Sequence, residues 1–203
     1  MAPAPENPLV TGVLLAAGGG RRLGGRPKAL LTYRGRPLIE HAIRSLRDGG
    51  CGRIVVVLGA AADEVRARST LTGCAVTVNP EWCAGMGGSL RAGLAALAGT
   101  GAEAALVLLV DQPGVGAEAV SRVRAAATSR ASLAAASYDG VRGHPVLLGA
   151  DHWAGVSADA TGDQGARAYL REHRAALTLV ECGDVAEAYD IDTPEDLGRL
   201  SGP

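Results

Sequence analysis

One loop of the sequence combines small residues with concentrated positive charge. Residues 18–28 are mostly glycine and arginine, end in Lys28, and directly follow the apolar run at residues 9–17. Glycine lets backbone N–H groups face an anion closely, and arginine and lysine add charge-assisted hydrogen bonds to phosphate oxygens. The loop therefore predicts a site for a phosphate-bearing ligand, with a flexible surface loop as the alternative interpretation.

Two familiar phosphate-binding motifs do not fit this loop. A dinucleotide-binding G-x-G-x-x-G would need glycine where the chain has Leu23, and an acid after the second strand, where it has Leu58-Gly59. A Walker A loop would need lysine directly after its last glycine, but Gly24 is followed by Gly25, and Gly25 by Arg26. The predicted phosphate site therefore belongs to neither class.

Carboxylates in the second half of the chain could hold a divalent cation. Asp111 ends the apolar run at residues 104–110, where a buried carboxylate is costly without a partner. Mg²⁺ is such a partner, because proteins bind it with one or two carboxylates plus substrate phosphates. Asp192 is the second candidate, and Asp190 would face the same side of an extended segment. Which of the two binds metal stays open, as do a turn-forming role for Asp111 and a helix-preceding role for Asp192.

The segments that would position these side chains alternate between extended and helical patterns. Short apolar runs predict buried strands, and apolar residues spaced three and four apart predict helices. Strands are expected at residues 9–17, 53–58, 75–78, 104–110, 133–138, 144–148 and 177–181. Helices are expected from Pro37 to Gly49, at 60–68, after Ser89, and at 116–128, 163–174 and 194–200.

This alternation predicts an α/β fold with three layers, Rossmann-like, around a mainly parallel, mixed central sheet. Ligands bind such sheets at the carboxyl ends of the strands. That edge would collect the loop at 18–28, the loop at 79–88 and Asp111. We expect residues 9–200 to form a single domain behind a short tail at residues 1–8.

The composition narrows the class of partner. The formal net charge is −1 and aromatic residues make up 3% of the chain, which argues against a nucleic-acid partner. No apolar run approaches the roughly 20 residues needed to cross a membrane. No C-x-x-C pair occurs, so the cysteines are interpreted as reduced thiols of a cytoplasmic protein. With a nucleic acid and a membrane argued against, a small molecule is the expected partner.

The glycine loop resembles the signature of a known family. Leu-Ala-Ala-Gly, then Arg-Leu-Gly and finally Lys is typical of NTP transferases of the MobA-like family, and this chain has it at residues 15–18, 22–24 and 28. Gly25 is one residue more than the pattern requires. The resemblance implies in-line attack by an acceptor on the α-phosphorus of an NTP, with pyrophosphate leaving and Mg²⁺ as the cofactor.

Later motifs resemble the molybdenum cofactor cytidylyltransferase branch, at residues 79–82, 85–94, 111–113, 142–146, 162–167 and 190–197. The branch implies transfer of CMP, in preference to GMP, from CTP or GTP to a phosphorylated acceptor, with molybdopterin favoured over a sugar phosphate. It also implies a molybdoenzyme or cofactor-insertion partner. The alternatives are an NAD(P)H-dependent oxidoreductase, like the nicotine blue oxidoreductase relatives of this branch, and a nucleotide-binding domain without catalysis.

The resemblance assigns the nucleotide contacts to the glycine loop. Arg22 would hold the departing phosphates and Lys28 would stabilise charge at the α-phosphate, which makes both candidate catalytic residues. The backbone contacts to the nucleotide are expected from Leu15, Ala16, Ala17, Gly18 and Gly20.

Residues farther along the chain would complete the site. Gly87 and Ser89 are expected in the base pocket, and Asp111 would bind both the nucleotide and the metal that it shares with Asp192. His144 and Arg167 are candidate acceptor contacts, and a structural role for His144 is an equal alternative.

Overall fold

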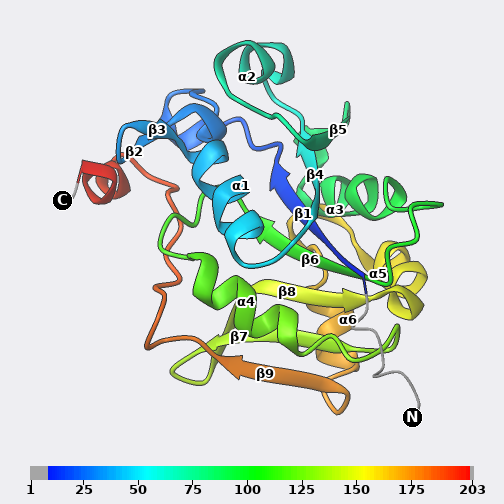
Figure 1. Ribbon diagram of the computed structural model, residues 1–203. Helices are drawn as coiled ribbons and strands as arrows, with labels where there is room; N and C mark the ends of the chain where they lie inside the picture. The colour runs from blue at the N-terminus through cyan, green and yellow to red at the C-terminus, as the bar shows by residue number, and fades with distance from the viewer. Residues whose placement is uncertain (1–8, 202–203) are drawn as a thin grey trace.

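In the computed structural model, which describes residues 9–201, a seven-stranded sheet forms the middle of three layers (Figure 1). Its strands are β1 (Val10–Ala16), β4 (Arg53–Leu58), β5 (Cys74–Val78), β6 (Ala104–Leu109), β7 (Leu133–Tyr138), β8 (Val141–Gly149) and β9 (Leu177–Glu181). Their order is β5-β4-β1-β6-β8-β7-β9, and only β8 runs antiparallel to its neighbours. The expected mainly parallel, mixed sheet is confirmed, and the expected tail at 1–8 lies outside the described residues.

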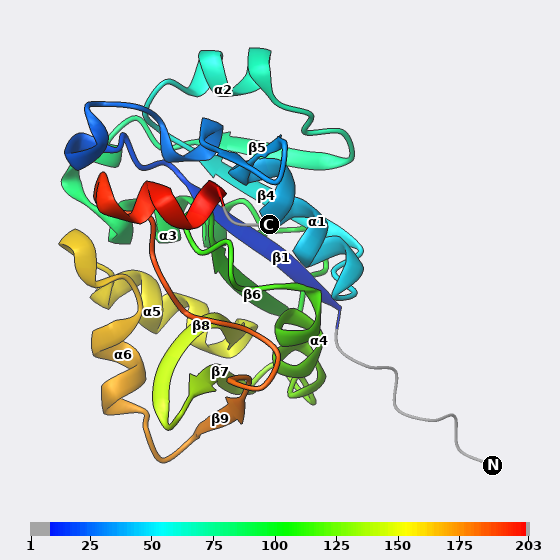
Figure 2. The same cartoon turned by 90° about the vertical axis from the view of Figure 1, so that its left-hand side faces the viewer.

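Helices cover both faces of the sheet (Figure 2). One face carries α1 (Leu38–Asp48) and α4 (Ala117–Ala125); the other carries α3 (Met86–Ala95), α5 (Trp153–Asp159) and α6 (Arg167–Glu172). The remaining helices are α2 (Ala62–Arg68), η1 (Arg21–Leu23), η2 (Lys28–Leu30), η3 (Trp82–Ala84), η4 (Ala150–His152), η5 (Gly162–Gln164) and η6 (Glu195–Ser201). A hairpin of β2 (Thr32–Tyr33) and β3 (Arg36–Pro37) stands apart. No helix in the described range is both long and apolar enough to cross a membrane.

The alternation of side chains along β1 builds a separate core on each face. Leu14 packs with α1 and α4, whereas Val13 and Leu15 pack with α3 and α6. Both faces of the central strands are buried, which explains their nearly continuous apolar sequence. Gly93 brings α3 close to the sheet, because a Cβ at this position would lie 2.6 Å from Val13 Cγ1.

Several expected elements end elsewhere. The single helix expected at 163–174 is wrong: Gly165, at φ 52°, separates η5 from α6. Helix α3 begins at Met86, before the expected start, and the final helix is η6, of the 3₁₀ type. The strand expected at 144–148 is confirmed as β8, which begins earlier, at Val141. Local pattern gives the element type more reliably than its end, because ends depend on single backbone conformations.

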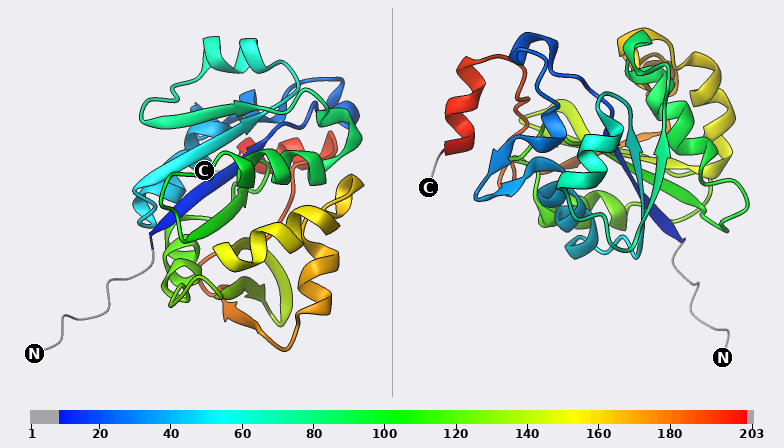
Figure 3. Two further views of the ribbon diagram at one scale, coloured as in Figure 1. Left: turned by 90° about the vertical axis from the view of Figure 1, so that its right-hand side faces the viewer. Right: turned by 90° about the horizontal axis from the view of Figure 1, so that it is seen from above.

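The segment after β9 returns across the sheet edge (Figures 1 and 3). Its backbone pairs with the loop after β6, where Ile191 N–H donates to Asp111 O (2.9 Å) and Glu187 N–H donates to Gly114 O (3.2 Å). Gly114 permits this approach, because a Cβ there would lie 2.3 Å from Glu187 O. The segment thereby carries Asp190 and Asp192 to the carboxyl end of β6.

Candidate functional site

Two neighbouring cavities open at the carboxyl ends of β1 and β6. The loop cavity, about 460 Å³, is bounded by residues 17–22, residues 82–86 and four aspartates, Asp111, Asp163, Asp190 and Asp192. The strand cavity, about 430 Å³, is bounded by β8 and residues 164–167. Their shared wall consists of Leu15, Met86, Arg167 and Asp190. Two ligands could therefore meet at this wall.

The glycine loop folds tightly beside β1. Gly20 has φ 58°, and its carbonyl accepts hydrogen bonds from Leu23 N–H (2.8 Å) and Gly25 N–H (3.0 Å). Gly19 lies under the Trp82 ring, since a Cβ at Gly19 would come within 2.9 Å of it. Arg21 anchors the loop by donating to Cys83 O (3.1 Å). This arrangement leaves Gly18 and Arg22 on the cavity wall, as a phosphate-binding loop requires.

Replacing Gly20 with alanine should lower stability by about 1–2 kcal/mol because a left-handed conformation disfavours side chains, and by more because the new side chain would collide with the loop. A Cβ would also lie 2.0 Å from Arg26 O. The melting temperature should fall by roughly 4–8 °C, and CTP should bind more weakly. Gly24→Ala is the matched control: Gly24 has φ 72° but open space around its Cβ, so it carries the conformational cost alone. Equal melting temperatures for the two variants would contradict the collision.

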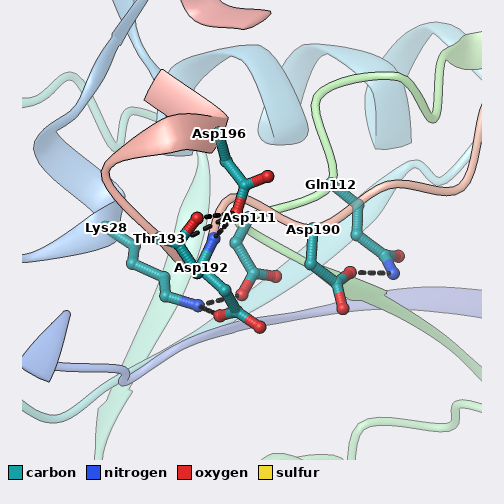
Figure 4. A network of polar contacts seen from close by, with 7 residues as sticks. All are labelled: Lys28, Asp111, Gln112, Asp190, Asp192, Thr193 and Asp196. Carbon is teal, nitrogen blue, oxygen red and sulfur yellow. Dashed lines mark hydrogen bonds and ion pairs between the residues drawn. The ribbon is translucent and has the colours of Figure 1, made fainter. Parts of the chain in front are cut away.

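Lys28 bridges the two predicted metal-binding carboxylates (Figure 4). Its Nζ donates to Asp111 Oδ2 (2.6 Å) and to Asp192 Oδ1. Burial by itself would lower the pKa of Lys28, but the two carboxylates outweigh it and the pKa is raised. Burial also raises the pKa of Asp111, against the opposing effect of Lys28. In this state the Lys28 ammonium neutralises the two carboxylates, so its contacts are not limited to a phosphate.

Neighbouring groups fix the backbone at Asp192 and the side chain of Asp190. Asp192 N–H donates to Asp196 Oδ2 (3.1 Å), which also accepts from the N–H (2.8 Å) and hydroxyl (3.0 Å) of Thr193. Asp190 is oriented separately, because its Oδ1 accepts from Gln112 Nε2 (2.7 Å). Figure 4 shows Asp190 turned away from Lys28 and toward Gln112. Asp192 is therefore the better placed partner of Asp111.

The donor set fits Mg²⁺. The Lys28 ammonium on two carboxylates demonstrates that positive charge is accommodated there. Within residues 9–201 no cluster of three His, Cys, Asp or Glu side chains could hold a metal ion alone. Two carboxylates completed by phosphate oxygens are the ligands that Mg²⁺ takes at nucleotide sites. Asp111 and Asp192 would hold it.

The other expected nucleotide contacts divide into two groups. Leu15, Ala17, Gly18, Gly20, Arg22 and Ser89 line the loop cavity. Ser89 is buried, and its hydroxyl accepts from Asn79 Nδ2 (3.1 Å). Ala16 and Gly87 line neither cavity: Ala16 is buried in the sheet, and a Cβ on Gly87 would lie 2.7 Å from the Ala160 backbone. The roles of these two residues in nucleotide binding stay predictions.

His144 lines the strand cavity. Burial, followed by repulsion from Arg167 and Arg142, lowers its pKa to about 4. The imidazole is therefore neutral at pH 7. Arg142 and Trp82 also line the cavities, although no role was predicted for either from the sequence. Their positions inside family motifs were the only signal that could have identified them.

Acidification should destabilise the protein through His144. Its folded pKa of about 4 lies below the ordinary value near 6.5, so between these two pH values only the unfolded chain binds the proton. Stability contributed by neutral His144 is present above pH 6.5 and is lost as the pH falls toward 4. His144→Gln should remove up to about 3 kcal/mol of this loss, at 1.36 kcal/mol per unit. Urea unfolding at pH 7 and pH 4.5 measures it; identical losses in both proteins would refute the assignment.

The chain is similar in sequence to several known proteins. The family model of the MobA-like NTP transferase domain matches residues 12–177. Nicotine blue oxidoreductase of Paenarthrobacter nicotinovorans is 44% identical, with 95% of this chain and 97% of that protein covered. Molybdenum cofactor guanylyltransferase of Shewanella halifaxensis is 30% identical, with 94% and 93% covered.

A solved structure agrees in fold. Rv0371C of Mycobacterium tuberculosis H37Rv, in complex with manganese, has a TM-score of 0.76 and 29% sequence identity, with 95% of this chain and 97% of that chain covered. The similarity therefore spans the sheet and both sets of helices.

Proposed function

The chain belongs to the MobA-like NTP transferase family, and from this we propose that it transfers a nucleoside monophosphate from an NTP to a phosphorylated acceptor, releasing pyrophosphate. The observation that carries the proposal is the meeting of Arg22, Lys28, Asp111 and Asp192 around one cavity. A second cavity beside it offers a place for the acceptor. We also propose that residues 9–200 act as one domain, because both cavities are built on the same sheet.

The residues would act by neutralising charge and aligning the two anionic reactants. Backbone N–H groups near Gly18 hold the triphosphate, and Arg22 neutralises the leaving pyrophosphate. Lys28 releases the carboxylates and stabilises charge at the α-phosphate. Mg²⁺, held by Asp111 and Asp192, would polarise phosphate oxygens when bound. Arg167, on the shared wall, positions the attacking acceptor phosphate.

We propose CTP as the favoured NTP and molybdopterin as the favoured acceptor, with GTP or a sugar phosphate as alternatives. The family motifs at residues 85–94 and 142–146 support this choice. The guanylyltransferase relative supports a molybdenum cofactor substrate and keeps GTP in consideration. A cytoplasmic location, where NTPs are abundant, and delivery of product to a molybdoenzyme follow from the same proposal.

An NAD(P)H-dependent oxidoreductase is the second candidate, because the nicotine blue oxidoreductase relative is 44% identical over nearly the whole chain. The usual dinucleotide site has an acid after its second strand that binds the ribose. Here β4 is followed by Gly59, Ala60 and Ala61, which carry no acid. An NTP with metal fits the basic loop and the paired carboxylates better than a nicotinamide does.

A paired assay separates these functions. With molybdopterin, Mg²⁺ and either CTP or GTP, pyrophosphate should appear only when all three components are present. Thermal shift should increase with NTP and Mg²⁺, because a ligand that binds the native state stabilises it. Stabilisation by NADPH alone, together with NADPH oxidation and no pyrophosphate, would establish the oxidoreductase instead.

A further inference from the structure

The Trp82 side chain packs against two glycines that follow two different strands. Gly59 comes directly after β4, and a Cβ there would lie 2.5 Å from Trp82 Cβ. Gly19 belongs to the glycine loop after β1, and a Cβ there would lie 2.9 Å from Trp82 Cη2, at the far end of the ring. Any side chain at either position would collide with the indole. The two glycines therefore make room for Trp82, which joins the loops after β1, β4 and β5.

The loop after β5 is fixed independently of the glycine loop. Asn79 N–H donates to Leu58 O (2.8 Å), at the end of β4. The buried Asn79 side chain accepts from Glu81 N–H through Oδ1 (3.0 Å), and Gly85 N–H donates to Trp82 O (3.2 Å), which closes η3. Because none of these bonds involves residues 18–28, the position of Trp82 does not depend on that loop.

The glycine loop itself needs such a contact. Residues 18–20 are three consecutive glycines, and glycine loses more conformational freedom on folding than any other residue. The hydrogen bonds that close the turn converge on Gly20 O, beyond Gly19. Trp82 covers Gly19 in the middle of this run, and Arg21 donates to Cys83 O (3.1 Å) beside it. Residues 82 and 83 thus hold the loop from a separate segment.

This contact lies on the wall of the loop cavity. Gly18, Gly19, Gly20, Arg22 and Trp82 all line it. The groups proposed to hold the triphosphate are backbone N–H groups, whose directions are fixed only where the backbone is fixed. Ordering a flexible segment on binding costs free energy, so a loop that is already ordered binds its ligand more tightly.

We propose that Trp82 is a positioning residue, whose indole orders the glycine loop before a ligand binds and thereby sets the affinity for the triphosphate group. The use of this order in nucleotidyl transfer rests on the proposed function, whereas the binding of a triphosphate by the ordered loop does not. Because a bound triphosphate also orders the loop, affinity depends on Trp82 more than turnover does. Direct stacking of Trp82 on the base is the competing explanation.

Inorganic tripolyphosphate with Mg²⁺ separates these explanations, because it carries the phosphates without a base. Calorimetry should show that Trp82→Ala binds it at least about ten-fold more weakly than the wild-type protein, the cost of ordering about one backbone residue. Binding of CTP with Mg²⁺ should weaken by the same factor. Pyrophosphate release at saturating CTP and acceptor should fall less than about three-fold, because the loop is ordered once the ligand is bound.

Two variants are the controls. Trp82→Phe keeps a ring beside Gly59 and should weaken tripolyphosphate less than about three-fold. Trp153→Ala truncates the other tryptophan of the chain, whose indole N–H donates to Leu148 O (2.8 Å) and which lines neither cavity. It should lower the melting temperature without changing tripolyphosphate affinity. Melting curves verify that each variant is folded during the titration.

A double-mutant cycle measures the contact between Gly19 and Trp82. Gly19→Ala alone should weaken tripolyphosphate about ten-fold, because the new Cβ would push the ring and the loop apart. In the Trp82→Ala background the same substitution should cost less than about three-fold, since the ring with which it would collide is gone.

Three results would overturn the inference: no tripolyphosphate binding by the wild-type protein, unchanged tripolyphosphate affinity in Trp82→Ala, or additive effects in the cycle. A loss confined to CTP would establish base stacking instead. Failure of the proposed function alone would look different. The protein would then bind tripolyphosphate in a manner that depends on Trp82, but would release no pyrophosphate with any NTP and acceptor.

Discussion

Asp111→Asn should abolish metal-dependent NTP binding and reduce pyrophosphate release by about a thousand-fold, the loss expected when a principal electrostatic group is removed. Asp111 follows the central strand β6, and its side chain is only 18% exposed. An amide at this position keeps the shape but removes the charge that a divalent cation requires. Thermal shift with CTP, measured with and without Mg²⁺, reads this loss directly.

Asp48→Asn provides the control for this substitution. Asp48 is exposed and ends α1 at the opposite edge of the sheet, so its removal should leave both measurements unchanged. A full Mg²⁺-dependent response in Asp111→Asn would show that the metal is held elsewhere, and would remove the central element of the proposed function.

Lys28→Met should slow pyrophosphate release by roughly a hundred-fold or more and should also make the metal-free protein less stable. Breaking a fully buried ion pair costs about 3–5 kcal/mol, and the cost here should be nearer 1–2 because the Asp192 side chain is 42% exposed. The melting temperature should therefore fall by several degrees. Mg²⁺ alone should then restore it, because a divalent cation can replace the missing ammonium between the carboxylates.

Two further variants sharpen this experiment. Lys28→Arg keeps the charge, but a planar guanidinium does not reproduce a compact ammonium, so it should not restore activity. In Lys28→Met combined with Asp192→Asn, the stabilisation by Mg²⁺ alone should shrink, since one of its ligands is lost. A Lys28→Met protein that ignores Mg²⁺ would contradict the shared position of the lysine and the metal.

The residue type at position 28 carries information in addition to its spacing within the glycine-loop motif. It is the only lysine in a sequence that otherwise uses arginine for its basic residues. A compact ammonium can approach two carboxylates at once, which a planar guanidinium does less well. The glycine-loop motif predicted that Lys28 binds phosphate, but not that it pairs with Asp111 and Asp192, which lie 83 and 164 residues away in the sequence.

The strand cavity was harder to predict from the sequence than the glycine loop. The sequence indicated a strand near His144 and a candidate acceptor contact at Arg167. It did not indicate that β8 inserts between β6 and β7, or that Arg142 thereby faces the same cavity as Arg167. Strand order depends on which apolar faces pack together, and that information is spread over the whole chain.

The sequence alone determined the α/β class, the bounds of strands such as β4 and β9, and the glycine loop with Asp111 at the end of a strand. These features are local: periodicity, apolar runs and glycine content act over a few residues. The tertiary structure alone decided the Lys28 bridge, the return of Asp192 to β6 and the break at Gly165 between η5 and α6. The first two depend on contacts between segments that are distant in the sequence, and the third depends on the backbone conformation of one residue. A short window of residues does not specify these contacts or that conformation.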